Sequence, residues 1–116
     1  MFDSRDYLKK YQKRMMDKSN PLEKDEASEI LMEISALLGN MSDAIIQADQ
    51  KYNLRLLEEL EKEEKANRAK IKAETSDEYI AKQQARNTKE LATELIRSLK
   101  YFIRSREDDW GAGRNM

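Results

Sequence analysis

Apolar residues recur every three or four positions along most of this chain, which is the spacing of one face of an α-helix. The longest run has steps close to a heptad and comprises Ile30, Ile34, Leu37, Met41, Ile45, Ala48, Tyr52, Leu56 and Leu60. The run keeps its phase across Gly39-Asn40, whereas a break in the helix would normally reset it. It therefore predicts one helix from about Leu22 to Ala73, in which Gly39 costs about 1 kcal/mol relative to Ala. The alternative is a helix that stops at Gly39 and restarts with Asn40 as its cap.

A shorter amphipathic helix is predicted before this run, from about Ser4 to Lys18. Its apolar face contains Tyr7, Leu8, Tyr11 and Met15, and its opposite face is rich in Lys and Arg. Asp3 or Ser4 can cap it, because a short side-chain oxygen there accepts a free backbone N–H. The segment Ser19-Asn20-Pro21 ends it, since proline disfavours helix in the residue before it. Residues 1–20 are thus a basic N-terminal helix.

A third helix is predicted from about Ser76 to Asp109. Thr75 and Glu78 have the spacing of a capping box, which places a turn near residues 74–76. The helix carries a broad apolar stripe that ends before Gly111-Ala112-Gly113, so residues 111–116 are expected to be a flexible tail. The stripe consists of Leu91, Ala92, Leu95, Ile96, Leu99, Phe102 and Ile103.

Together these patterns predict an all-α fold, a long antiparallel helical hairpin resembling a coiled coil, formed by residues 21–110. With the turn near Glu74, the numbers of opposed residues add up to about 150, so that Leu99 faces Tyr52. Only three Gly and one Pro are present, too few for the turns of an all-β fold. Residues 22–40 would project beyond the end of the third helix and leave their apolar seam without a partner. We therefore expect a homo-oligomer, with an interface formed by Ile30, Ile34, Leu37 and Met41.

Charge is distributed unevenly, although the net charge is only -1. Residues 1–22 carry +3, residues 23–64 carry -8 and residues 65–116 carry +4. This pattern is compatible with a polyanion bound at local basic surfaces, and equally with head-to-tail packing of acidic and basic stretches in an oligomer.

Enzymatic chemistry is not expected. The chain has no Cys and no His, which excludes disulfides, cysteine nucleophiles and histidine general bases. The run of carboxylates at residues 58–64 lacks the His that a di-metal site in a helical bundle would use. The sequence thus predicts a protein with no catalytic residues, no metal and no cofactor. No stretch approaches the roughly 20 apolar residues of a membrane helix, so we expect a soluble cytoplasmic protein without a membrane partner.

Basic residues form three rows at helical spacing. Two rows lie near the expected tip of the hairpin and are the candidate nucleic-acid contacts: Lys65, Arg68 and Lys72, and then Lys82, Arg86 and Lys89. The third row is Arg97, Lys100 and Arg104, with Tyr101 beside it. Such rows can follow a phosphate backbone, and an aromatic ring among them can stack on a base. Each row taken alone is also compatible with ordinary solubilising charge.

The closing helix contains the segment Ile96-Arg97-Ser98-Leu99-Lys100-Tyr101-Phe102-Ile103-Arg104. This segment, and the order of a long helix, a charged tip rich in Lys and Ala, and a return helix, resemble the UvsY family of small helical recombination mediators of tailed phages. The resemblance implies an oligomer that binds single-stranded DNA and helps to load a recombinase onto DNA coated by single-strand-binding protein. It also implies a phage-encoded protein that acts in the cytoplasm of a bacterial host. The tip here contains more Glu than that family leads one to expect.

A second hypothesis belongs to a different class. The chain could be a helical protein-interaction module, such as a phage anti-defence inhibitor or an assembly factor. Its acidic middle segment could mimic DNA or fill a basic groove, and its basic amphipathic first helix could dock into a partner.

Overall fold

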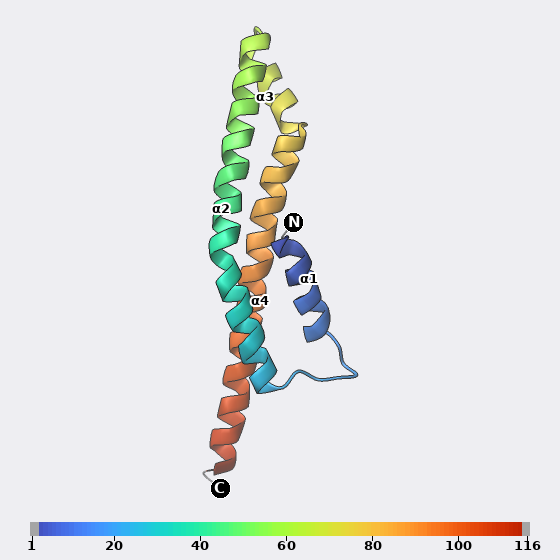
Figure 1. Cartoon of the computed structure of the whole chain (residues 1–116), viewed down its shortest axis with the longest axis vertical. Helices are drawn as coiled ribbons and strands as arrows, with labels where there is room; N and C mark the ends of the chain where they lie inside the picture. The colour runs from blue at the N-terminus through green and yellow to red at the C-terminus, as the bar shows by residue number, and fades with distance from the viewer. Residues whose placement is uncertain (1–2, 115–116) are drawn as a thin grey trace. The chain divides into compact units, whose positions relative to one another are not determined.

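The computed structural model describes residues 3–114, and the side chains of residues 3–107, as four α-helices (Figure 1). Their bounds are α1 Ser4–Met15, α2 Lys24–Lys62, α3 Ala66–Glu74 and α4 Asp77–Arg114. Within the described residues there is no strand, which confirms the all-α class. The predicted pairing, in which opposed residue numbers add up to about 150, also places Trp110 near Met41, but the side chain of Trp110 lies outside those described.

Helix α1 begins where the sequence predicts. The Asp3 carboxylate accepts the backbone N–H of Arg5 at 3.0 Å, so Asp3 is the cap of the two candidates. The helix ends at Met15, a few residues before the predicted end. Leu8 is its one buried residue and is fully inaccessible to solvent. The attachment of α1 to the rest of the chain therefore depends strongly on this side chain.

An arginine near the end of α1 ties this helix to the start of α2. The Arg14 guanidinium donates from Nε and Nη2 to the two carboxylate oxygens of Glu26, at 2.6 and 2.5 Å. Its Nη1 donates to the backbone carbonyl of Asn20 at 2.6 Å. Two parallel N–H···O bonds give such a pair geometric specificity as well as charge attraction. Arg14 thus fixes the connection that Figure 1 shows between α1 and α2.

Helix α2 is continuous through Gly39, as the heptad phase predicts, but it ends earlier than expected. The sequence predicted helix as far as Ala73, whereas α2 stops at Lys62 and a separate helix, α3, follows. Residues 63–65 contain no Gly or Pro, so local sequence does not explain the break. Long-range packing does: Ala69 and Ala73 of α3 are fully buried, and Lys72 forms an ion pair with Glu63. Figure 1 shows α3 beside the end of α2.

A second break separates α3 from α4 at Thr75-Ser76, where the sequence predicts one. Its capping differs from the predicted box of Thr75 and Glu78. The buried Ser76 hydroxyl accepts the backbone N–H of Tyr79 at 3.3 Å and donates to the carbonyl of Ala73 at 2.5 Å. Thr75 closes α3 instead, because its hydroxyl donates to the Lys72 carbonyl at 2.9 Å. Ser76 is therefore the cap of α4.

The chain divides into two compact units, to both of which α2 and α4 contribute. The first unit comprises Met1–Leu38 and Glu90–Met116. Its core consists of Leu8, Ala27, Ile30, Ile34, Ala92, Leu95 and Leu99. In this unit Lys24 at the start of α2 forms an ion pair with Glu107 of α4 at 3.3 Å. Residues 22–40 thus have apolar and charged partners within the same chain.

The four residues of the predicted oligomer interface are buried or half-buried within a single chain. Ile30, Ile34 and Met41 are only 5%, 0% and 2% exposed in a single chain, and Leu37 is half-buried. The expected overhang does not exist, because α4 continues to Arg114, past Gly111 and Gly113 where the sequence predicted a tail. Of that predicted tail, residues 115–116 lie outside the described residues. A seam that is already covered is not available to a second copy.

The second unit, Gly39–Lys89, has a core of small side chains around one aromatic ring. Its buried residues are Met41, Ala48, Tyr52, Glu59, Ala69, Ala73 and Ser76. Tyr52 of α2 contacts Tyr79 of α4 with ring centroids 5.5 Å apart, not Leu99 as expected. The numbers of paired residues here add up to about 131 to 135 instead of about 150. The register differs because α2 ends at Lys62 and α3 already lies beside it.

Candidate nucleic-acid interface

The first predicted basic row, Lys65, Arg68 and Lys72, lies at the start of α3 and along it. Lys65 precedes the helix in extended conformation and makes no side-chain cap, and Arg68 is exposed. Lys72 is engaged with Glu63. The hydrogen bond from the Lys72 ammonium lowers the pKa of the Glu63 carboxyl, and the same bond raises the pKa of Lys72. Lys65 and Arg68 form no ion pair with the described residues, although the charge of Arg68 also helps to lower the pKa of Glu63.

The second predicted row, Lys82, Arg86 and Lys89, is largely occupied in contacts with the same chain. The Lys82 ammonium lies 4.3 Å from the centre of the Tyr52 ring, a cation–π contact. The Arg86 guanidinium is 3.0 Å from the carboxylate of Asp49 on α2. Lys89 also has an interaction within the chain. Lys82 and Arg86 thus join α4 to α2 in the second unit.

The tip is consequently a weaker polyanion surface than its lysine and arginine content indicates. Glu63 and Asp49 lie against the cations that were expected to meet phosphate. A nucleic-acid strand would have to displace these carboxylates and would then be repelled by them. The sequence contained these acids, but their position opposite the basic rows depends on where α2 ends. Of the two predicted rows at the tip, Lys65 and Arg68 are the cations that remain exposed without an ion pair among the described residues.

The third row, on α4 in the first unit, has a different environment. Tyr101 is 75% exposed and contributes almost nothing to the core. Lys100 and Arg104 flank it, are exposed, and have no ion-pair partner among the residues that the structure describes. Arg97 pairs with Glu94 at 3.1 Å, but both side chains are largely exposed, so the pair contributes little to stability. Within the described side chains, this row therefore combines two cations that form no ion pair, Lys100 and Arg104, with an exposed aromatic ring.

The geometry of this row follows from helix periodicity. Residues 97, 100, 101 and 104 occupy one face of α4, and seven residues span about 10 Å along a helix axis. The opposite face carries the buried residues Ala92, Leu95 and Leu99. The row is therefore presented outward by a helix that the core holds in place, and substitutions on it should leave that core intact.

Neither a metal site nor a membrane-spanning helix is found among the described residues. No group of three or more Asp or Glu side chains there could hold a metal ion. In the same part of the chain, no helix has both the length and the apolar composition needed to cross a membrane.

No family model, curated protein or solved structure matches the chain.

Proposed function

We propose that this chain is a non-enzymatic accessory protein of phage-type recombination or replication, which binds single-stranded DNA and assists recombinase loading. The observation that carries the proposal is Tyr101, exposed on α4 between Arg97, Lys100 and Arg104. Single-stranded DNA is bound by cations that follow its backbone and by aromatic rings that stack on its bases. This row offers both without unfolding or rearrangement of the chain. The partners in this proposal are single-stranded DNA and a recombinase or single-strand-binding protein.

The proposal moves the principal contact from the tip to α4. Lys65 and Arg68 are retained as secondary contacts because they are exposed and uncommitted. Lys72, Lys82, Arg86 and Lys89 are assigned to intrachain contacts instead. The proposal therefore predicts that charge reversal on α4 weakens DNA binding more than charge reversal at the tip.

The test is fluorescence anisotropy with a labelled oligothymidine at two salt concentrations. If about three phosphates are contacted, a fourfold rise in salt should weaken binding about 20-fold. The substitution Tyr101→Ala should weaken binding about 5- to 150-fold, since base–aromatic stacking is worth roughly 1–3 kcal/mol. The triple variant R97E/K100E/R104E should abolish binding at the higher salt.

The matched control is R68E with K65E, which reverses exposed charges at the tip. Equal losses in this control and in the α4 variants would show non-specific attraction and refute the site on α4. No binding of the wild-type protein at low salt would refute the proposed function itself. Recombinase loading is tested separately, by the rate of filament assembly on an oligonucleotide coated with single-strand-binding protein.

We further propose that α2 and α4 form an antiparallel hairpin along their whole length. Three contacts support it, because each joins an early residue of α2 to a late residue of α4 or the reverse: Lys24 with Glu107, Asp49 with Arg86, and Tyr52 with Tyr79. The chain has no Cys, so cysteines introduced in place of Lys24 and Glu107 can be joined selectively by a short bismaleimide. Efficient cross-linking within one chain is expected. Failure to form it would refute the hairpin in that region.

The second candidate function is a helical protein-interaction module. It is favoured by four exposed apolar side chains on α2 in the second unit: Ile46 at 55%, Leu54 at 62%, Leu57 at 56% and Leu60 at 41% exposure. They share the helix face opposite the buried Ala48 and Tyr52. Exposed apolar patches of this kind mark interaction surfaces. We propose that this face, in place of Ile30, Ile34 and Met41, supports homo-oligomerisation.

Light scattering after size exclusion tests the oligomer. The wild-type protein should self-associate at micromolar concentration, and L54E with L57E should be monomeric while keeping its helical circular dichroism. A wild-type monomer at that concentration would contradict self-association.

A further inference from the structure

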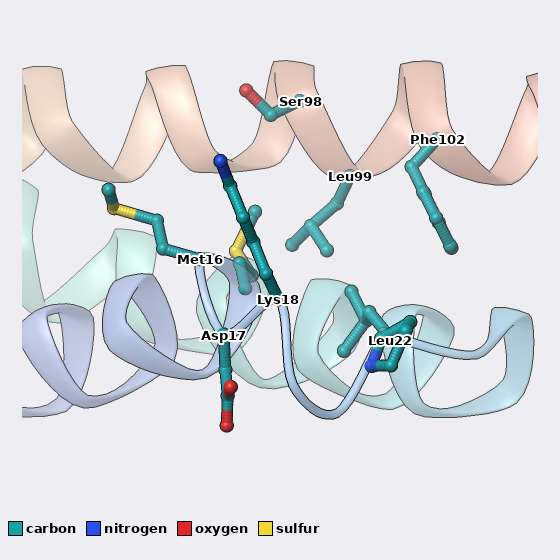
Figure 2. Close-up of a pocket in the computed structure, with 9 residues that line it drawn as sticks. Met16, Asp17, Lys18, Leu22, Ser98, Leu99 and Phe102 are labelled. Carbon is teal, nitrogen blue, oxygen red and sulfur yellow. The ribbon is translucent and has the colours of Figure 1, made fainter.

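The first unit contains an apolar groove that the proposed DNA contact does not use. It lies between the α1–α2 connection and one face of α4 and has a volume of about 450 Å³ (Figure 2). Its lining is Met15, Met16, Asp17, Lys18, Pro21, Leu22, Ser98, Leu99 and Phe102. Leu99 is fully buried and forms the floor, whereas Met16 is 71% exposed at the rim. The groove is therefore apolar at its base and open to solvent at its edge.

One lysine crosses this groove. Figure 2 shows the Lys18 side chain extending toward α4 and Ser98, while Asp17 points away. The Asp17 carboxylate accepts the backbone N–H of Ser19 at 3.0 Å and its hydroxyl at 2.6 Å. The hydroxyl bond is the main cause of the lowered pKa of Asp17. Asp17 contributes to the lining of the groove, but its carboxylate is turned toward Ser19 and away from α4. Lys18 has no acidic partner in the described part of the chain.

A second cation borders the groove at Phe102. The Arg106 guanidinium carbon is 5.1 Å from the centre of the Phe102 ring. Its neighbour Glu107 is engaged with Lys24, at 3.3 Å. In residues 3–107 Arg106 has no ion-pair partner, and Glu26 near the start of α2 is paired with Arg14. Glu23 and Asp25 follow Leu22 in the chain but do not line the groove.

We infer that this groove binds an acidic peptide segment of a partner protein, which inserts a large apolar side chain between Leu99 and Phe102 and places carboxylates against Lys18 and Arg106. A volume of this size suits one or two side chains entering from the surface. Methionines such as Met15 and Met16 are flexible and adapt to different apolar side chains, as in other peptide-binding surfaces. Lys18 and Arg106, which form no ion pair with any described side chain, supply the charge complementarity, which selects an acidic partner. The inference is independent of the DNA contact on α4.

The test uses protein labelled with ¹³C in the methionine methyl groups and a synthetic hexapeptide, Phe-Leu flanked by two aspartates on each side. The methyl signals of Met15 and Met16 should shift on titration, whereas those of Met32 and Met41, which do not line the groove, should not. The variant K18E/R106E should raise the dissociation constant at least tenfold. The matched control K9E/K13E reverses two exposed charges on α1 and should change it less than twofold.

Peptide controls separate the contributions of charge and apolar contact. Replacing Phe-Leu by Ala-Ala, or the aspartates by lysines, should each abolish the shifts. Absence of shifts at 2 mM acidic peptide, equal shifts at Met32 and Met41, or an unchanged dissociation constant in K18E/R106E would each overturn the inference. Dodecanoate is the probe for a small amphipathic anion. Stronger binding of dodecanoate than of the peptide, at the same methyl groups, would overturn it as well.

Discussion

Leu8 offers a direct test of how the short N-terminal helix is held. It is the only buried residue of α1 and is fully inaccessible to solvent. An isolated helix of 12 residues is marginal in water, so α1 persists only while it is docked. Truncating a buried leucine to alanine costs about 2–5 kcal/mol. The only described ion pair that joins α1 to another helix, Arg14 with Glu26, is partly exposed and contributes much less than the burial of Leu8.

The substitution Leu8→Ala should therefore release α1 without unfolding the remainder of the chain. A loss of 2–4 kcal/mol of docking free energy corresponds to a fall of about 30- to 1000-fold in hydrogen-exchange protection. This fall should appear at the amides of Ser4–Met15, measured by nuclear magnetic resonance or mass spectrometry. Amides of residues 39–89 should change less than threefold. The matched control Lys9→Ala alters an exposed residue of the same helix and should leave protection unchanged.

Two results would refute this reasoning. Undiminished protection of α1 in the Leu8→Ala variant would show that other contacts hold the helix. An equal loss of protection in residues 39–89 would show that Leu8 stabilises the whole chain cooperatively.

Three further predictions concern backbone and charge. Gly39→Ala should raise the free energy of unfolding by about 1 kcal/mol in urea denaturation, because Gly39 is inside α2 and an added Cβ would meet no atom within 4 Å; a loss of stability would contradict a continuous helix. Lys72→Met should raise the pKa of Glu63 toward its ordinary value in a carboxyl titration, since the Lys72 bond lowers it. The bond between Lys72 and Glu63 stabilises the fold at pH values above the ordinary pKa of a Glu carboxyl, and this contribution is lost as the pH falls through the lowered pKa of Glu63. An unchanged Glu63 pKa in the Lys72→Met variant would disprove the pairing. Burial, followed by a hydrogen bond with Glu33, raises the pKa of Tyr11 to about 12. The free energy of unfolding should thus fall between pH 10 and about 12, because Tyr11 ionises in the unfolded chain before it ionises in the folded one. Glu33→Gln should lower the pKa of Tyr11 in an absorbance titration. A higher Tyr11 pKa in that variant would contradict the role of Glu33.

Local signals in the sequence predicted several elements correctly. The Asp3 cap, the interruption around Pro21 and the break at Thr75-Ser76 all depend on residues within a turn of the feature, and the continuity of α2 through Gly39 follows from the phase of its apolar run. Helix periodicity likewise identified the buried face, since Ile34, Met41 and Leu99 are core residues. These features follow from local preferences that tertiary packing does not oppose.

The end of α2 at Lys62 could not be predicted in this way. The sequence there consists of Glu, Lys and Ala, which favour helix, and the chain turns because Ala69 and Ala73 gain burial beyond the turn. Every pairing downstream depends on that turn, so the expected register was displaced. The ion pairs formed by the predicted nucleic-acid contacts at the tip could not be predicted for the same reason. Asp49 pairs with Arg86, and Glu63 pairs with Lys72, only in the observed register. The α4 row depended on helix periodicity alone and was recognisable from sequence.

The exposed junction between Lys62 and Ala66 also has a practical use. Glu64 and Lys65 are both exposed there, and the Lys65 side chain does not cap α3. A fluorophore, an affinity tag or a protease site inserted at this point would replace no residue of the basic row around Tyr101, of the exposed apolar face of α2 or of the apolar groove in the first unit. Cleavage there would divide the protein into two fragments, whose reassembly could be followed as a reporter of folding.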